Sequence, residues 1–147
     1  MLSVFDSRDI NRGKVSAKLF YGSSQGFYKF NSQVYCKVHN LIQVRKSLPV
    51  MVDGDFELLQ TKSKSNFAYL RKNKNKQILV INNLSKEKLY ADITLPIDII
   101  LKNNGKINKL KNLINGDNIK VNISLKNKTM HLRLSPYQTL WLDVTPN

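Results

Sequence analysis

The chain has 147 residues, 41% of them hydrophobic, and its 24 Lys and Arg exceed its 10 Asp and Glu by 14 charges. This length and apolar content suffice for one domain with a core that needs no covalent support, and the single cysteine, Cys36, excludes an intrachain disulfide. The N-terminus lacks a basic stretch followed by an apolar one, and no apolar run approaches the ~20 residues that span a bilayer. We therefore expect no signal peptide, no membrane segment and a cytoplasmic location.

Residues 1–31 show no sustained hydrophobic period. They combine glycine, serine and charged residues with several aromatic side chains. An irregular stretch of this length is unusual inside a compact domain. We expect it to lie across a neighbouring body rather than to form part of a core.

Residues 32–48 carry the one strong helical pattern. Ser32 is a candidate N-cap, and Pro49 restricts Leu48 and is expected to end the helix. Apolar side chains recur at the spacing of one helix face. That face is formed by Val34, Val38, Leu41 and Ile42.

After Pro49 the apolar period changes to two, which is typical of half-buried strands. Asp53-Gly54-Asp55 is predicted to be a turn in which Gly54 supplies a positive φ angle. Further turns are predicted at Asn103–Gly105 and at Asn115–Asp117, of the kind that joins hairpins. The predicted strands cover residues 56–60, 67–71, 77–82, 89–95, 97–101, 119–125, 130–134 and 140–144.

This spacing of about eight short strands predicts a mainly β fold. Glycine, asparagine and proline turns separate the strands, as in an antiparallel, Greek-key-like β-sandwich. Residues 50–147 would form the sandwich, and the helix and irregular segment would precede it.

The positive charge raises the question of a nucleic-acid partner. A nucleic-acid-binding sheet interleaves aromatic and basic side chains on one face, but here the lysines gather in predicted turns with asparagine, as at residues 72–76. This distribution favours a solvated surface and argues against nucleic acid as a partner. A stand-alone basic β module that binds nucleic acid or carbohydrate is the alternative interpretation.

No constellation of residues indicates a catalytic, metal or cofactor site. The two histidines, His39 and His131, belong to different predicted elements, whereas a metal site needs clustered ligands. Asp53, Asp55 and Glu57 form the tightest acidic group. They are interpreted as solvated residues of a turn and a strand start, with a weak cation site as the alternative.

Trp141 is the aromatic residue with the clearest predicted orientation. It is out of phase with the apolar positions Leu140, Leu142 and Val144, so it is expected to face away from them. Burial in a second layer is the first interpretation. Stacking on a sugar or a base is the second.

Residues 34–59, VYCKVHNLIQVRKSLPVMVDGDFELL, resemble the last barrel helix and the following junction of α-amylase-type glycoside hydrolases (family 13). The shared residues there are Leu41, Ile42, Arg45, Lys46, Pro49, Gly54 and Phe56. The strand region is similar to the family through Phe67, Ala68, Tyr69, Arg71, Leu79, Val80, Asn82, Asn83, Leu134, Pro136, Tyr137 and Leu142. An upstream loop resembles the segment after barrel strand eight through Arg8, Asp9, Arg12, Ser23, Gly26 and Phe27, but Val15–Lys18 replace its Pro-Met-x-Trp part.

The resemblance implies a division into three parts. Residues 1–31 would be the remnant of a barrel loop, residues 32–48 the last barrel helix, and residues 50–147 the C-terminal β-sandwich. The catalytic acids of the family lie on barrel strands that precede this region, so no residue here takes a catalytic role.

The expected function is therefore that of a non-catalytic C-terminal domain, or a fragment carrying it, of a bacterial α-glucosidase-like enzyme that acts on α-glucosidic bonds. The expected partner of the helix face is the catalytic barrel, or a second copy of the chain. Residues 15–31 folding over that face are a further possibility. Weak contact with an oligosaccharide is expected at Arg8, Arg12, Tyr137 and Trp141.

Overall fold

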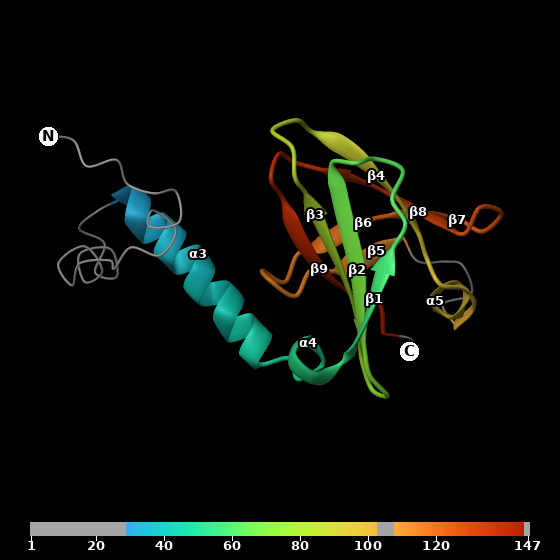
Figure 1. Ribbon diagram of the computed structural model, residues 1–147, viewed down its shortest axis with the longest axis horizontal. Helices are drawn as coiled ribbons and strands as arrows, with labels where there is room; N and C mark the ends of the chain where they lie inside the picture. Colours follow the sequence, from blue (N-terminus) through green and yellow to red (C-terminus); the bar gives the residue numbers. More distant parts are fainter. Residues whose placement is uncertain (1–28, 103–107, 146–147) are drawn as a thin grey trace, which may run out of the picture. The chain divides into compact units, whose positions relative to one another are not determined.

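The computed structural model describes residues 29–102 and 108–145 of the chain. The chain divides into two compact units, residues 1–42 and 43–147. Figure 1 shows the elements, which are α3 (Lys29–Lys46), α4 (Val50–Asp53), β1 (Asp55–Leu59), β2 (Asn66–Lys72), β3 (Gln77–Asn83), β4 (Leu89–Thr94), α5 (Ile97–Lys102), β5 (Lys109–Lys111), β6 (Asn118–Lys120), β7 (Asn122–Ser124), β8 (Thr129–Leu134) and β9 (Thr139–Asp143). Within the described ranges no helix is long and apolar enough to cross a membrane.

The predicted long helix is confirmed as α3, although its start differs. The helix already runs from Lys29, so Ser32 lies inside it and the N-cap prediction is wrong. No glycine or proline lies between Lys29 and Lys46 to force a later start. Arg45 and Lys46 occupy the last turn, where positive charge complements the helix dipole.

A one-turn helix, α4, follows immediately after Pro49 and was not predicted. Pro49 caps it with a helical φ of −51°, which a proline ring adopts readily. Val50 and Met51 are buried. A single turn is too short to be stable alone, so packing of these side chains stabilises it.

The prediction that Gly54 has a positive φ angle is wrong. Its φ is −69° and ψ is 156°, an extended conformation open to any residue. A Cβ atom there would lie 2.5 Å from the Val50 carbonyl oxygen and 3.0 Å from the Lys72 carbonyl oxygen. Glycine is required because the backbone of Gly54 itself lies against the carbonyls of Val50 in α4 and Lys72 in β2, a close approach that sequence periodicity cannot reveal.

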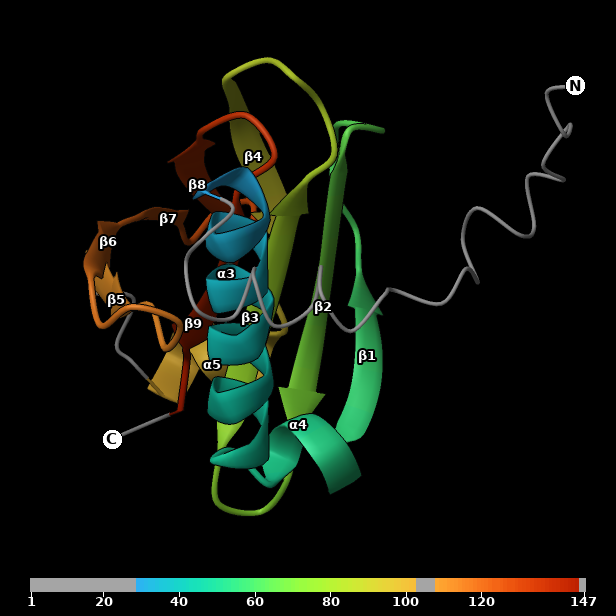
Figure 2. The same cartoon turned by 90° about the vertical axis from the view of Figure 1, so that its left-hand side faces the viewer.

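The nine described strands form antiparallel sheets, as predicted from the period of two. A four-stranded sheet has the order β1-β2-β3-β9, a three-stranded sheet the order β4-β8-β7, and β5 pairs with β6. Figure 2 shows β1, β2 and β3 side by side in the four-stranded sheet. The last strand, β9, pairs with β3 rather than with its chain neighbour β8.

The two larger sheets share one hydrophobic core. Alternate residues of each strand point inward, and the inner side chains of both sheets are almost fully buried. They include Ala68, Leu70, Leu79, Ile81, Leu140 and Leu142 from one sheet and Ala91, Ile93, Met130, Leu132 and Leu134 from the other. This arrangement is the predicted β-sandwich.

The predicted strand at residues 97–101 is instead the helix α5. Ile99 and Ile100 are buried while Ile97 is 51% exposed, so two adjacent residues face the core, as helical spacing allows. Pro96 precedes the first turn, which contains Asp98, and both residues suit a helix start. The β-branched isoleucines had favoured a strand. The predicted turn at Asn103–Gly105 lies outside the described residues.

The predicted strand at residues 119–125 is divided between β6 and β7. Val121 is buried between them, and Leu125, the last residue of the predicted strand, is 57% exposed in the turn after β7. The turn at Asn115–Asp117 is confirmed, because Gly116 has a φ of 82°.

Candidate functional site

The outer face of the four-stranded sheet carries most of the aromatic residues of the strand region. Cross-strand pairing places Leu58 beside Tyr69, Tyr69 beside Val80, and Val80 beside Trp141. These residues alternate with the core residues of the same strands, so their side chains lie on the opposite face. The predicted orientation of Trp141, away from Leu140 and Leu142, is confirmed.

The β1–β2 part of this face is apolar and exposed, whereas Val80 and Trp141 are buried. The exposed fractions are 56% for Phe56, 62% for Leu58 and 40% for Phe67. The ring centroids of Phe56 and Tyr69 lie 5.0 Å apart, and those of Phe67 and Tyr69 lie 5.6 Å apart. Contiguous apolar surface of this kind marks interaction sites in soluble proteins.

A hollow of about 360 Å³ opens at the α4 end of this face. Its lining comes from the last turn of α3, from α4 and from three strands of the sheet. The lining residues are Arg45, Met51, Val52, Phe56, Tyr69, Arg71 and Trp141. We call it the arginine hollow.

The guanidinium of Arg71 is fixed by two backbone carbonyls. Its Nε donates to the Val50 oxygen at 3.3 Å, and its Nη2 donates to the Val52 oxygen at 3.1 Å. These bonds tie β2 to α4. Burial raises the pKa of Tyr69, against the smaller opposite effect of the positive charges on Arg71 and Arg45. No carboxylate is among the lining residues.

Two of the four residues predicted to contact sugar, Tyr137 and Trp141, belong to the described residues. Arg8 and Arg12 lie outside the described residues. Tyr137 lies in the β8–β9 turn, 68% exposed, with a φ of 51°. Trp141 lines the arginine hollow and Tyr137 does not, so sugar contact at these positions stays a prediction.

Sequence reasoning missed the arginine hollow. Arg45 was placed in the helix of residues 32–48, and Phe56 and Tyr69 were placed in separate strands. Alternation puts Phe56 on a definite face of its own strand, but which residues of neighbouring strands stand beside it depends on the register. No signal in one strand alone gives that register.

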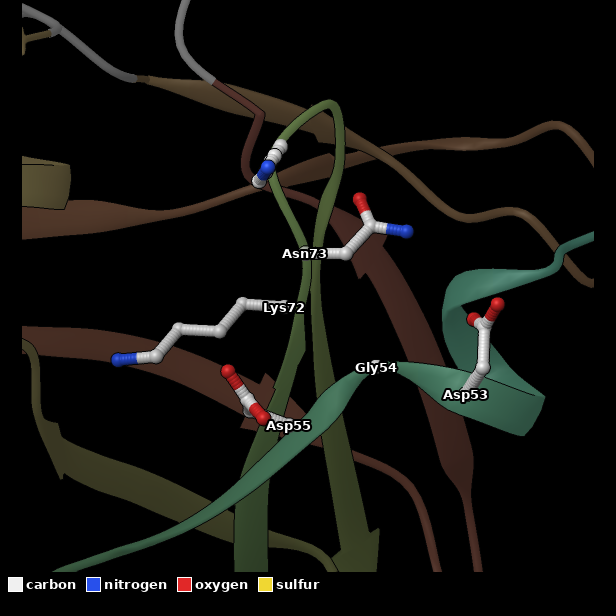
Figure 3. Close-up of a pocket in the computed structure, with 6 residues that line it drawn as sticks. Asp53, Gly54, Asp55, Lys72 and Asn73 are labelled. Atoms are coloured by element: carbon white, nitrogen blue, oxygen red, sulfur yellow. The ribbon is translucent and has the colours of Figure 1, made fainter.

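The acidic group at the start of the sheet does not converge on one point. Figure 3 shows the side chains of Asp53 and Asp55 on opposite sides of Gly54, around a second hollow of about 370 Å³. The Lys72 ammonium is 2.6 Å from the Glu57 carboxylate, and this hydrogen bond raises the pKa of Lys72. In the part of the chain that the structure describes, no three His, Cys, Asp or Glu residues could share a metal ion.

His131 pairs with a carboxylate across the three-stranded sheet. Its Nδ1 lies 2.6 Å from Oδ1 of Asp92, directly opposite on β4, and Lys62 contacts Oδ2 of the same carboxylate at 3.2 Å. The hydrogen bond to His131 is the main cause that lowers the pKa of Asp92, with Lys62 adding to it. A partly exposed pair of this kind is expected to contribute modestly to stability.

Replacing Asp92 by asparagine should destabilise the protein modestly and in a pH-dependent way. A carboxyl whose pKa is lowered by folding stabilises the protein above its unfolded pKa, and this contribution is lost as the pH falls through the folded pKa. We expect a loss of up to about 1 kcal/mol at pH 7, as for other partly exposed ion pairs. The difference should shrink as the pH falls below the pKa of an unfolded aspartate, about 3.9, and vanish only below the lowered pKa of folded Asp92.

Urea unfolding at pH 7, 5 and 3 measures this difference. Asp55→Asn is the matched control, because that carboxylate is exposed and should change stability little. A difference between Asp92→Asn and the parent that is the same at pH 7 and pH 3 would show that the ion pair contributes nothing.

Comparison with known proteins gives partial matches. No model of a protein family matches the chain. Glucan 1,6-α-glucosidase of Streptococcus pneumoniae is 42% identical over 62 residues, which are 42% of this chain and 11% of that protein. Trehalose-6-phosphate hydrolase of Bacillus subtilis is 35% identical over 65 residues, 44% of this chain and 11% of that protein. The match thus spans about a tenth of the length of either relative.

Solved structures share the fold over more of the chain. A maltogenic α-amylase from Thermotoga neapolitana aligns with a TM-score of 0.55 and 20% identity, over 72% of this chain and 24% of that one. An α-amylase from Anoxybacillus aligns with a TM-score of 0.56 and 18% identity, over 78% of this chain and 23% of that one. Together with the sequence matches, the shared fold confirms the resemblance to the C-terminal region of family 13 enzymes.

Proposed function

We propose that this chain is the non-catalytic C-terminal domain of an α-glucosidase-like enzyme of glycoside hydrolase family 13, and that it stabilises the catalytic barrel. The observation that carries the proposal is the match to about a tenth of two glycosidases. The sandwich fold, which α-amylases share, supports it. The parent enzyme would act on α-glucosidic bonds in carbohydrate metabolism.

The apolar face of α3 is the surface that we propose for the barrel. Val34, Val38 and Ile42 are each 46–50% exposed, and they follow one another at helical spacing. Such a stripe normally packs against another element. Without a barrel, we expect a second copy of the chain to cover it.

We also propose that the parent enzyme is bacterial and lies in the cytoplasm. Both curated relatives come from bacteria. The single cysteine, Cys36, is exposed and free, which suits a reducing compartment.

Two measurements test the assignment as an enzyme domain. Reading the DNA upstream of codon one should reveal a barrel in frame, and the chain alone should not hydrolyse a chromogenic α-glucoside. Turnover by the chain alone would contradict the proposal. A salt-dependent mobility shift with oligonucleotides, without any in-frame barrel, would instead support the basic-module alternative.

A further inference from the structure

We propose that the arginine hollow binds a phosphorylated sugar. The inference is independent of the barrel proposal, because it rests on residues of the sheet, α4 and the end of α3. Two arginines, three aromatic residues and no carboxylate line the hollow. This combination offers positive charge and apolar surface to one small ligand.

The arginines supply the anion-binding part. A guanidinium has five N–H donors in a planar fork, and Arg71 uses two of them for the carbonyls of Val50 and Val52. These two bonds hold the group in place and leave further donors for a phosphate, which guanidinium groups bind bidentately. Arg45 adds a second positive charge to the same lining, and the net charge of +14 draws anions to the chain.

The aromatic residues supply the part that binds the ring. One face of a pyranose presents C–H groups, which gain free energy when they leave water against an apolar surface. Phe56 is 56% exposed beside Tyr69, and their ring planes are tilted by 33°. Because the two rings are tilted, a flat base cannot stack between them. A puckered sugar ring can contact both aromatic rings. The volume of about 360 Å³ lies within the range of small-molecule sites.

The fluorescence of Trp141 can report ligand binding directly, because Trp141 is the only tryptophan of the chain and lines the arginine hollow. We expect its fluorescence to change saturably with glucose 6-phosphate, with a Kd below about 10 mM, and calorimetry to confirm the binding. Glucose and inorganic phosphate should each bind at least about tenfold more weakly, since each offers only half of the contacts. AMP, measured by calorimetry, should also bind more weakly than glucose 6-phosphate.

The substitutions are made at exposed residues, so that a change in binding does not arise from a loss of folding. Arg45→Gln should weaken binding of glucose 6-phosphate at least about fivefold, and Phe56→Ala at least about threefold. The matched controls are Arg133→Gln and Tyr90→Ala, exposed residues of the three-stranded sheet, which should bind as the parent does.

Four results would overturn the proposal. They are no saturable change with glucose 6-phosphate up to about 10 mM, inorganic phosphate binding as tightly as the sugar phosphate, AMP binding more tightly, or Arg133→Gln weakening binding as much as Arg45→Gln. The second of these would show a general anion site, and the third a nucleotide site.

Discussion

Replacing Leu79 by alanine is expected to lower the free energy of unfolding by about 3–4 kcal/mol. Leu79 lies on β3 between β2 and β9, opposite Leu70 and Leu142, and its side chain is fully buried. Truncation removes apolar contacts from both neighbouring strands and leaves a cavity that a sheet interior cannot close. Urea unfolding followed by far-UV circular dichroism measures the loss.

Leu58→Ala is the matched control for this prediction. Leu58 lies on the edge strand β1 of the same sheet, on its outer face, and is 62% exposed. The same change of side chain there should cost under about 1 kcal/mol, since little surface is buried. Equal losses at the two positions would contradict the assignment of the inner and outer faces.

Replacing Asn83 by alanine should cost about 2–4 kcal/mol, through buried hydrogen bonds rather than apolar contact. Asn83 is 2% exposed, and its Nδ2 donates at 2.8 Å to each of the carbonyl oxygens of Glu87 and Ser135. Its Oδ1 accepts from the Ser85 amide at 2.9 Å. Alanine would leave these backbone groups without that partner and would loosen both the β3–β4 loop and the β8–β9 turn.

The neighbouring Asn82 is the control. It is partly buried, and its Oδ1 accepts one hydrogen bond, from Oγ1 of Thr139 at 2.9 Å. Asn82→Ala should therefore cost about 1 kcal/mol. Thermal unfolding of both variants gives the comparison, and an Asn83→Ala variant as stable as Asn82→Ala would show that the bonds of Asn83 do not stabilise the fold.

Periodicity predicted the strands well where one face is buried. Leu140, Leu142 and Val144 alternate in the sequence and are all buried, and Trp141 lies on the other face as expected. The same reasoning was wrong at Ile97–Leu101, because β-branched residues outweighed the helix-start signal of Pro96 and Asp98. Short apolar runs do not distinguish a strand from one helical turn by period alone.

The candidate site was much less predictable than the fold. The arginine hollow joins Arg45, Phe56, Arg71 and Trp141, which are separated by up to 96 positions in the chain. Their meeting depends on the register of four strands and on the short helix α4, whose single turn gave no periodic signal. Glycine at position 54 was likewise assigned to the wrong cause, since it is needed where the chain lies against the carbonyls of Val50 and Lys72.

The proposed stabilisation of a catalytic barrel is tested most directly by expressing the barrel proposed for the parent enzyme alone and together with this chain. We expect the chain to raise the melting temperature and α-glucosidase activity of the barrel, because a partner that binds only the folded state stabilises it. Val38→Asn, on the apolar face of α3, should abolish the gain, and Lys37→Asn, an exposed neighbour, should preserve it. A barrel equally stable and active without the chain would contradict the account.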